Sequence, residues 1–212
     1  MLKREFTGLI IAFFSLAALF YTNSYFFYFL FSCILMTAAY ELSFLIKKPY
    51  FPSFITLILI FTSILLMPIY ELSRSLMLFA ISISVFTDSA CYYFGKNFGS
   101  IKIFPKTSPN KTLEGLIFGS VFTFLLLFFI VYSQIFEIYL RGLPKGNGPL
   151  TTLLLLSIFA SILGDFIESR LKRIADVKDS GNIFPGHGGM LDRLDSHLLA
   201  LPLFFIILGL LK

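Results

Sequence analysis

The sequence predicts an all-α integral membrane protein, a polytopic helical bundle of about seven transmembrane helices with its N-terminus in the cytoplasm. Of the 212 residues, 57% are hydrophobic and only 14% are charged, whereas a soluble domain carries about 25% charged residues. The 28 Phe and 10 Tyr side chains are too many for the solvated surface of a chain of this size. This composition excludes a nuclear, secreted or disordered protein.

Continuous apolar runs predict the individual helices, near residues 6–22, 24–40, 51–70, 75–94, 115–138, 150–168 and 197–211. Each run is close to the length of about 20 residues that a helix needs to cross the hydrocarbon core. The runs lack the alternation of a barrel strand, and a helix satisfies its own backbone hydrogen bonds in lipid. We divide the chain into N-terminal transmembrane helices over 1–75 and a C-terminal membrane region over 76–212.

The distribution of basic residues predicts the orientation in the membrane. With the N-terminus inside, 13 of the 17 Lys and Arg residues fall on one side and 4 on the other. Basic residues in short loops resist translocation, so the richer side is expected to be the cytoplasm. The net charge of +5 then lies beside anionic headgroups and is no evidence for a nucleic-acid partner. We expect a multi-pass protein of a bacterial inner membrane.

Two cytoplasmic loops, over 95–115 and 168–196, differ in composition from the rest of the chain. Together they carry 9 of the 17 basic residues, seven of the 14 glycines and six of the 12 acidic residues. The remaining loops are short, and the turn near 141–149 is rich in Gly and Pro. If the protein has an active site, we expect it in these two loops, facing the cytoplasm.

Two acidic residues stand inside or beside predicted transmembrane helices. A carboxylate at the middle of such a helix costs about 2.5 to 3.5 kcal/mol on insertion scales, so it needs a partner or a function. Hydration at the interface explains Asp88 equally well. Asp165 differs because helical spacing places it on one face with Glu168, Ser169 and Lys172. That face can hold a cation at one end and a phosphate at the other.

The stretch FPGHGGMLDRLD, residues 184–195, contains a glycine-rich turn. Gly188 and Gly189 allow a tight loop whose backbone N–H groups can point at an anion. His187, between glycines, can donate to a phosphate, carry a proton or fix the shape of the loop. We favour contact with the substrate.

An acidic pair follows this turn. Asp192 and Asp195 are three residues apart with Arg193 between them, so on a helix both carboxylates share a face. Hard oxygen ligands beside basic residues suit Mg²⁺ bound together with substrate phosphates. Such spacing alone is common on solvated helices, but the combination with the His-Gly-Gly turn and the Lys-Arg pair is specific.

The run SRLKRIADVKDSGNIFPGHGGMLDRLD, residues 169–195, resembles the signature of the CDP-diacylglycerol synthase (phosphatidate cytidylyltransferase) family. The matching positions are Ser169, Lys172, Arg173, Lys178, Asp179, Pro185, His187, Gly188, Gly189, Asp192, Arg193 and Asp195. The blocks DSACYYFGKNFG (88–99) and SPNKTLEG (108–115) are also similar to this family, so the resemblance covers roughly the C-terminal 60% of the chain. Leu113 stands where the family usually has Trp, and the N-terminal portion looks abbreviated.

The resemblance implies transfer of CMP from CTP to phosphatidic acid, which gives CDP-diacylglycerol and pyrophosphate and requires Mg²⁺. It implies a catalytic role for the residues Asp165, Asp192, Lys172 and Asp195, of which Asp165 and Asp192 would hold the metal. The residues expected to bind substrate are Ser169, Arg173, Lys178, His187, Gly188, Gly189, Arg193, Lys111 and Asp88. The sequence leaves open whether a second cation binds and whether two copies pair as a homodimer.

Two other classes compete with this interpretation. A CDP-alcohol phosphotransferase or a prenyltransferase would carry two clustered aspartate motifs, whereas this chain has one, joined to a His-Gly-Gly turn. An ion-coupled transporter also contains intramembrane acids and helices broken by Gly and Pro. It would place those acids near the middle of the bilayer in repeated halves, and this sequence has no internal repeat.

Overall fold

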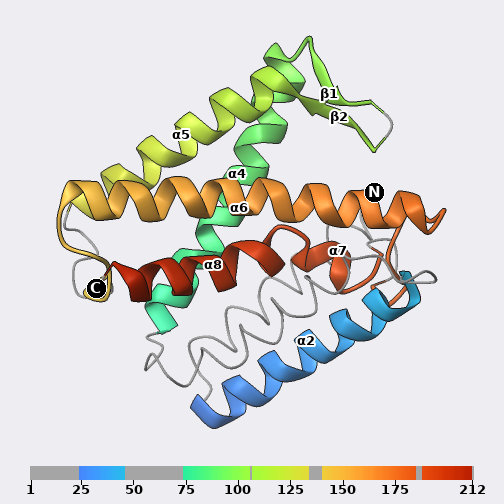
Figure 1. The fold of residues 1–212 in the computed structure, drawn as a ribbon, viewed down its shortest axis with the longest axis horizontal. Coiled ribbons are helices and arrows are strands. Elements are labelled where there is room, and N and C mark those ends of the chain that lie inside the picture. The colour runs from blue at the N-terminus through green and yellow to red at the C-terminus, as the bar shows by residue number, and fades with distance from the viewer. Residues whose placement is uncertain (1–23, 46–73, 106, 134–139, 185–187, 212) are drawn as a thin grey trace. The chain divides into compact units, whose positions relative to one another are not determined.

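The computed structural model describes residues 24–45, 74–105, 107–133, 140–184 and 188–211 of the chain. These residues are mostly helical, with one small antiparallel sheet (Figure 1). The elements are α2 (Ser24–Leu45), α4 (Arg74–Phe98), β1 (Lys102–Phe104), β2 (Ser108–Thr112), α5 (Leu113–Tyr132), α6 (Asn147–Ile174), α7 (Leu191–Leu194) and α8 (His197–Leu210).

The chain forms two compact units that do not follow sequence order. The first unit contains α2 together with Leu171–Leu194, and within it α2 contacts α7. The second unit contains α4, the sheet, α5, most of α6 and α8. Helix α6 passes from the second unit to the first after Arg170. Each unit therefore contributes a separate set of candidate residues.

Apolar helices of membrane-spanning length are present. Among the described residues, three helices are long and apolar enough to cross a membrane, Ser75–Phe98, Leu113–Tyr132 and Asn147–Ile174. A stripe of large apolar side chains along α5 is exposed, with Phe129 at 68%. Such a stripe is unfavourable in water and is typical of a surface that faces lipid. The helices thus support a membrane protein.

The helices agree with the apolar runs wherever the structure describes them. The predicted runs in this set are 24–40, 75–94, 115–138, 150–168 and 197–211, although α5 is described only to Tyr132. Helix α8 is shorter than a full span, which matches the shortness of its run. The runs at 6–22 and 51–70 lie outside the described residues. A count of seven spans and the position of the N-terminus therefore stay predictions.

Small residues let α4 and α5 pack closely near the sheet (Figure 1). A Cβ atom at Gly115 would overlap the backbone of Cys91 and Gly95 on α4. One turn further along α5, a Cβ at Gly119 would overlap the backbone of Cys91. The contact lies near the end of α4 and the start of α5, which flank the β-hairpin. Part of the candidate site lies at this hairpin. Glycine in a helix interior costs stability, and close packing of this kind is the compensation.

The β-hairpin is a difference from the all-α prediction. Strands β1 and β2 pair with Lys102 opposite Thr112 and Phe104 opposite Ser108, with a register irregularity between the two pairs. The prediction treated 95–115 as a loop between the apolar runs 75–94 and 115–138. Thr112 then caps α5, since its hydroxyl accepts the Gly115 N–H at 3.2 Å. The hairpin thereby holds Lys111 beside the start of a helix.

Helix α6 continues past the apolar run and ends in a Schellman motif. The N–H of Val177 donates to the carbonyl of Lys172 at 3.0 Å, and the N–H of Asp176 donates to that of Arg173 at 3.2 Å. Asp176 has φ +57°, the left-handed conformation that Asp tolerates better than most residues. Lys172 therefore lies on the last turns of a regular helix, as the predicted helical face requires.

Candidate functional site

A cavity of about 240 Å³ lies in the second unit, among α4, β2, α5 and α6. Its polar wall combines two carboxylates, a lysine and several neutral groups. The lining residues are Asp88, Cys91, Tyr92, Ser108, Asn110, Lys111, Thr112, Leu116, Ile162 and Asp165. Three residues that the sequence assigned to substrate or metal, Asp88, Lys111 and Asp165, thus line one cavity.

The Lys111 ammonium of β2 forms an ion pair with Asp165 Oδ2 of α6. Both side chains are partly buried, with 21% and 20% of their surface exposed. The other oxygen, Asp165 Oδ1, accepts the Ser169 hydroxyl at 3.3 Å, one helical turn away. This bond shows that Asp165 and Ser169 share a face of α6, as their spacing predicts. The cavity therefore holds a carboxylate whose charge is balanced by a lysine.

Asp88 of α4 accepts a hydrogen bond from Ser196, the residue that precedes α8. The Ser196 hydroxyl donates to Asp88 Oδ2 at 2.5 Å and lies 3.4 Å from Asp195 Oδ1. Asp195 also accepts the backbone N–H of Ser196 at 2.8 Å. Because a hydroxyl has one proton, the shorter contact identifies Asp88 as its acceptor. Ser196 thereby joins a cavity carboxylate to the end of the aspartate motif.

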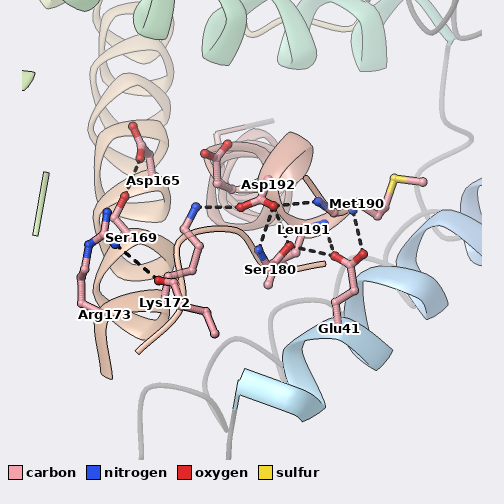
Figure 2. Close-up of polar contacts among 12 residues, drawn as sticks. Glu41, Asp165, Ser169, Lys172, Arg173, Ser180, Met190, Leu191 and Asp192 are labelled. Atoms are coloured by element: carbon pink, nitrogen blue, oxygen red, sulfur yellow. Dashed lines mark hydrogen bonds and ion pairs between the residues drawn. The ribbon is translucent and has the colours of Figure 1, made fainter. Parts of the chain in front are cut away.

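A second cluster of polar contacts lies in the first unit, around Asp192 (Figure 2). The Lys172 ammonium donates to Asp192 Oδ1 at 2.8 Å. Oxygen Oδ2 accepts the N–H groups of Ser180 and Gly189, both at 2.8 Å, and lies 3.0 Å from the Ser180 hydroxyl. Asp192 thus ties the end of α6 to both sides of the glycine-rich loop.

The electrostatics of Asp192 follow from these contacts. Burial raises the pKa of its carboxyl group, but the hydrogen bond from Lys172 and the backbone N–H groups of Gly189 and Ser180 lower it by more. The net pKa lies below the ordinary value of about 3.9 for Asp. Asp192 is therefore a carboxylate at neutral pH, as a cation ligand must be.

Glu41 of α2 contacts the segment that carries the signature, and the sequence analysis did not single it out. Its Oε1 accepts the N–H of Met190 at 3.0 Å, and its Oε2 accepts the N–H of Leu191 at 2.8 Å (Figure 2). The Ser180 hydroxyl lies 2.9 Å from the same Oε2. The available signal was an acid immediately after the apolar run 24–40. Its partners are 139 to 150 positions away, so spacing could not reveal them.

The glycines of the turn have a steric role. Gly188 has φ +84°, and a Cβ there would overlap Asp192 Oδ2. A Cβ at Gly189 would overlap the Glu41 carboxylate and the Ser180 hydroxyl. Their expected contact with substrate stays a prediction, and the Gly189 N–H already donates to Asp192. His187 lies outside the described residues, so its assignment also stays a prediction.

The remaining basic residues of the signature are exposed, namely Arg173, Lys178 and Arg193. A guanidinium N–H of Arg173 donates to the carbonyl of Val177 at 3.4 Å. Lys172 differs because only 14% of its side chain is exposed. Helix α7 has four residues and ends at Leu194, so Asp195 follows it and does not share a helical face with Asp192 in this short element.

The donor chemistry of the cavity fits Mg²⁺. Asp88 and Asp165 offer carboxylate oxygens, and Ser108 and Asn110 offer neutral oxygens. Within the described ranges, no group of three His, Cys, Asp or Glu side chains is placed to hold a metal ion alone. Mg²⁺ usually binds through one or two carboxylates, with water and substrate phosphates completing its octahedron. A metal that depends on substrate phosphates agrees with this arrangement.

Comparison with known proteins identifies the chain's relatives. A model described as the cytidylyltransferase family matches residues 51–211. A phosphatidate cytidylyltransferase of Bacillus subtilis (strain 168) is 46% identical over 127 residues, which cover 58% of this chain and 44% of the relative. Proteins of the same name from Staphylococcus haemolyticus (strain JCSC1435) and Staphylococcus aureus (strain COL) are 42% and 44% identical, each over 62% of this chain and 48% of the relative. The chain thus spans about half the length of these relatives.

Proposed function

Because the chain belongs to the cytidylyltransferase family, we propose that it transfers CMP from CTP to phosphatidic acid. The products are CDP-diacylglycerol, used in phospholipid synthesis, and pyrophosphate. The observation that carries this proposal is the cavity that brings Asp88, Lys111 and Asp165 together beside exposed apolar helices. A transporter is not favoured, because the matched relatives are named as transferases.

The reaction needs positioning and charge neutralisation more than covalent help. An oxygen of the phosphatidic acid phosphate bonds to the α-phosphorus of CTP, and the bond from that phosphorus to the bridging oxygen breaks. The electron pair leaves with pyrophosphate. No general base is required, because the attacking phosphate is ionised near neutral pH. In such a transfer most of the acceleration comes from orientation and electrostatic stabilisation.

Cationic side chains counter the repulsion between the two substrates. At an effective dielectric constant of about 20, two like charges 4 Å apart repel by about 4 kcal/mol. Lys111 lines the cavity, where it can contact a phosphate on exchanging its bond with Asp165. Lys172, Arg173, Lys178 and Arg193 are the further cations that we assign to substrate phosphates. Ser169 would donate its hydroxyl to the same groups.

Asp165 and Asp192 are the proposed Mg²⁺ ligands, and Asp195 is a proposed catalytic or second-cation carboxylate. Asp88 lines the cavity together with Asp165 and offers a further carboxylate there. Bound Mg²⁺ supplies Lewis-acid stabilisation of the phosphate oxygens. The protein's own part is to orient these carboxylates. The Ser169 hydroxyl does this for Asp165, and the Ser180 and Gly189 N–H groups do it for Asp192.

The proposed location is the bacterial inner membrane, with the N-terminus and the active site on the cytoplasmic side. The 13 to 4 division of basic residues supports this orientation. CTP would enter from the cytoplasm, while phosphatidic acid would present its phosphate at headgroup level from the lipid. A cavity lined by both polar residues and apolar ones such as Leu116 and Ile162 suits a substrate with these two characters.

An acceptor assay in membranes tests the proposal. Membranes carrying the protein should convert labelled CTP into a lipid-soluble product only when phosphatidic acid and Mg²⁺ are both present. Chelation should stop the reaction, and added Mg²⁺ should restore it. Incorporation with diacylglycerol in place of phosphatidic acid would reject the proposed substrate. Membranes without the protein provide the background.

A further inference from the structure

Glu41 lies outside the signature, yet its carboxylate contacts the signature loop directly. Only 4% of the residue is exposed, and α2 holds it against the loop inside the first unit. Its contacts reach both sides of the segment 181–189. Ser180 lies on one side, while Met190 and Leu191 lie on the other. One buried side chain thus contacts residues on both sides of the glycine-rich segment.

The donors that Glu41 faces would otherwise be costly to bury. Met190 and Leu191 are at the start of α7, where backbone N–H groups have no partner within the helix. A charged acceptor forms stronger hydrogen bonds to such groups than a neutral one does. Within the described part of the chain, the groups that donate hydrogen bonds to Glu41 are the Ser180 hydroxyl and the N–H groups of Met190 and Leu191, all of which are neutral. The Glu41 carboxylate therefore fixes the positions of these donors through hydrogen bonds and not through an ion pair.

Gly181 and Gly189 leave space that the Glu41 carboxylate occupies. A Cβ at Gly181 or at Gly189 would overlap Glu41 oxygens. Glycine at both positions therefore leaves room for the Glu41 carboxylate in the place that it occupies. Two glycines, one on each side of the loop, are thus coupled to a single residue of a distant helix.

Glu41 and Asp192 also share a donor. The Ser180 hydroxyl lies 2.9 Å from Glu41 Oε2 and 3.0 Å from Asp192 Oδ2. It has one proton, so it donates to one carboxylate at a time. A change in the position of Glu41 must therefore alter the contacts of Asp192, which is a proposed metal ligand.

We propose that Glu41 is a positioning residue that holds the signature loop in the geometry that binds a substrate phosphate and that fixes the contacts of the proposed metal ligand Asp192. The proposal rests on the proposed function, since it assigns that loop to substrate. It adds a residue from the N-terminal helices to the determinants of the reaction. Glu41 acts through Ser180, Met190 and Leu191, and does not itself contact the substrate.

Hydrogen exchange tests the structural half of this proposal without any assay of activity. In the full chain in nanodiscs, Glu41→Ala should accelerate exchange of the Met190 and Leu191 amides by about tenfold to a hundredfold, the loss expected for hydrogen bonds to a charged group. Glu41→Gln keeps the size and should give a smaller acceleration. Ser43→Ala is the matched control, because its exposed hydroxyl donates to the carbonyl of Tyr40 on the same helix. Unchanged exchange in Glu41→Ala would overturn the proposal.

Kinetics test the functional half. Glu41→Gln should raise KM for CTP or for phosphatidic acid by at least several-fold, and separate titrations of the two show which phosphate the loop binds. A merely structural role would lower kcat in proportion to the lost folded protein and leave both KM values unchanged. That result would overturn the proposal. If the wild-type protein forms no CDP-diacylglycerol, the proposed function fails, while the exchange experiment still reports on Glu41.

A double-variant cycle provides a further check on the contact. Gly189→Ala should accelerate exchange at the same amides, because its methyl group would displace the Glu41 carboxylate. Combining it with Glu41→Ala removes the carboxylate oxygens that the methyl group meets and leaves its overlap with the Ser180 hydroxyl, so the double variant should show less than the sum of the two effects. Strict additivity would contradict the proposed coupling.

Discussion

Lys111 and Asp165 are 54 positions apart in the sequence, yet they form an ion pair between β2 and α6. Both residues line the same cavity. The β-hairpin is what makes this contact, because it carries Lys111 from the end of α4 back toward α6 before α5 begins. The pair therefore links the short β-hairpin to a carboxylate on a helix of membrane-spanning length.

Removing the lysine should impair catalysis more than folding. Lys111→Ala should lower kcat/KM for CTP by about tenfold to a hundredfold, since a hydrogen bond to a charged group is worth about 1.5 to 3 kcal/mol. The loss of stability should be small, because a partly exposed pair is screened by solvent. Lys102→Ala, at an exposed position of β1, is the control. Equal activity of the two variants would remove Lys111 from the site.

Neutralising Asp165 should abolish turnover while the protein stays folded. Asp165→Asn keeps an oxygen for the Ser169 hydroxyl but loses the charge that pairs with Lys111 and that a cation requires. Ser169→Ala removes only a 3.3 Å hydrogen bond and should cost less than tenfold. Turnover of labelled CTP and thermal unfolding in nanodiscs measure the two properties. Wild-type activity in Asp165→Asn would exclude it as a metal ligand.

Asp192 should matter for both structure and activity. The spacing of the motif alone predicts that Asp192→Asn abolishes turnover without loss of folded protein. The structure adds the bonds from Lys172, Ser180 and Gly189, several of which an amide NH₂ cannot accept. We therefore expect a loss of about 1 to 3 kcal/mol in unfolding free energy as well. Denaturation curves that overlay those of the wild type would contradict this role in the loop.

The close contact between α4 and α5 should be sensitive to one methyl group. Gly119→Ala would place a Cβ against the backbone of Cys91 and should destabilise the protein by about 1 to 3 kcal/mol. Gly148→Ala is the matched control, because a Cβ there meets nothing within 4 Å. Thermal unfolding of both variants in the same detergent makes the comparison. A similar midpoint for both would show that α4 and α5 do not pack as described.

Apolar runs were enough to predict the long described helices but not the four-residue α7, because a helix that faces lipid needs an uninterrupted apolar segment. The spacing of Asp165 and Ser169 likewise predicted a shared face, which their hydrogen bond confirms. These features depend on residues within a few turns of one another. The β-hairpin was not predicted, because its strands are three and five residues long and contain polar and proline residues.

The contacts of Glu41 could not be predicted from the spacing of residues in the sequence. Its role depends on contacts with Ser180, Met190 and Leu191, which only tertiary packing brings to α2. In the same way, spacing suggested that Asp192 and Asp195 act as a pair, whereas α7 is too short to hold both. The sequence predicts that these carboxylates can bind cations or accept hydrogen bonds, but their partners depend on the tertiary structure.

The position of a phosphorus label tests the central claim most directly. CTP labelled at the α-phosphate should transfer its label to a lipid when phosphatidic acid and Mg²⁺ are present, while label at the γ-phosphate should appear in pyrophosphate. This result requires transfer of CMP. Label from the γ-phosphate in the lipid, or no lipid label from either position, would contradict the account.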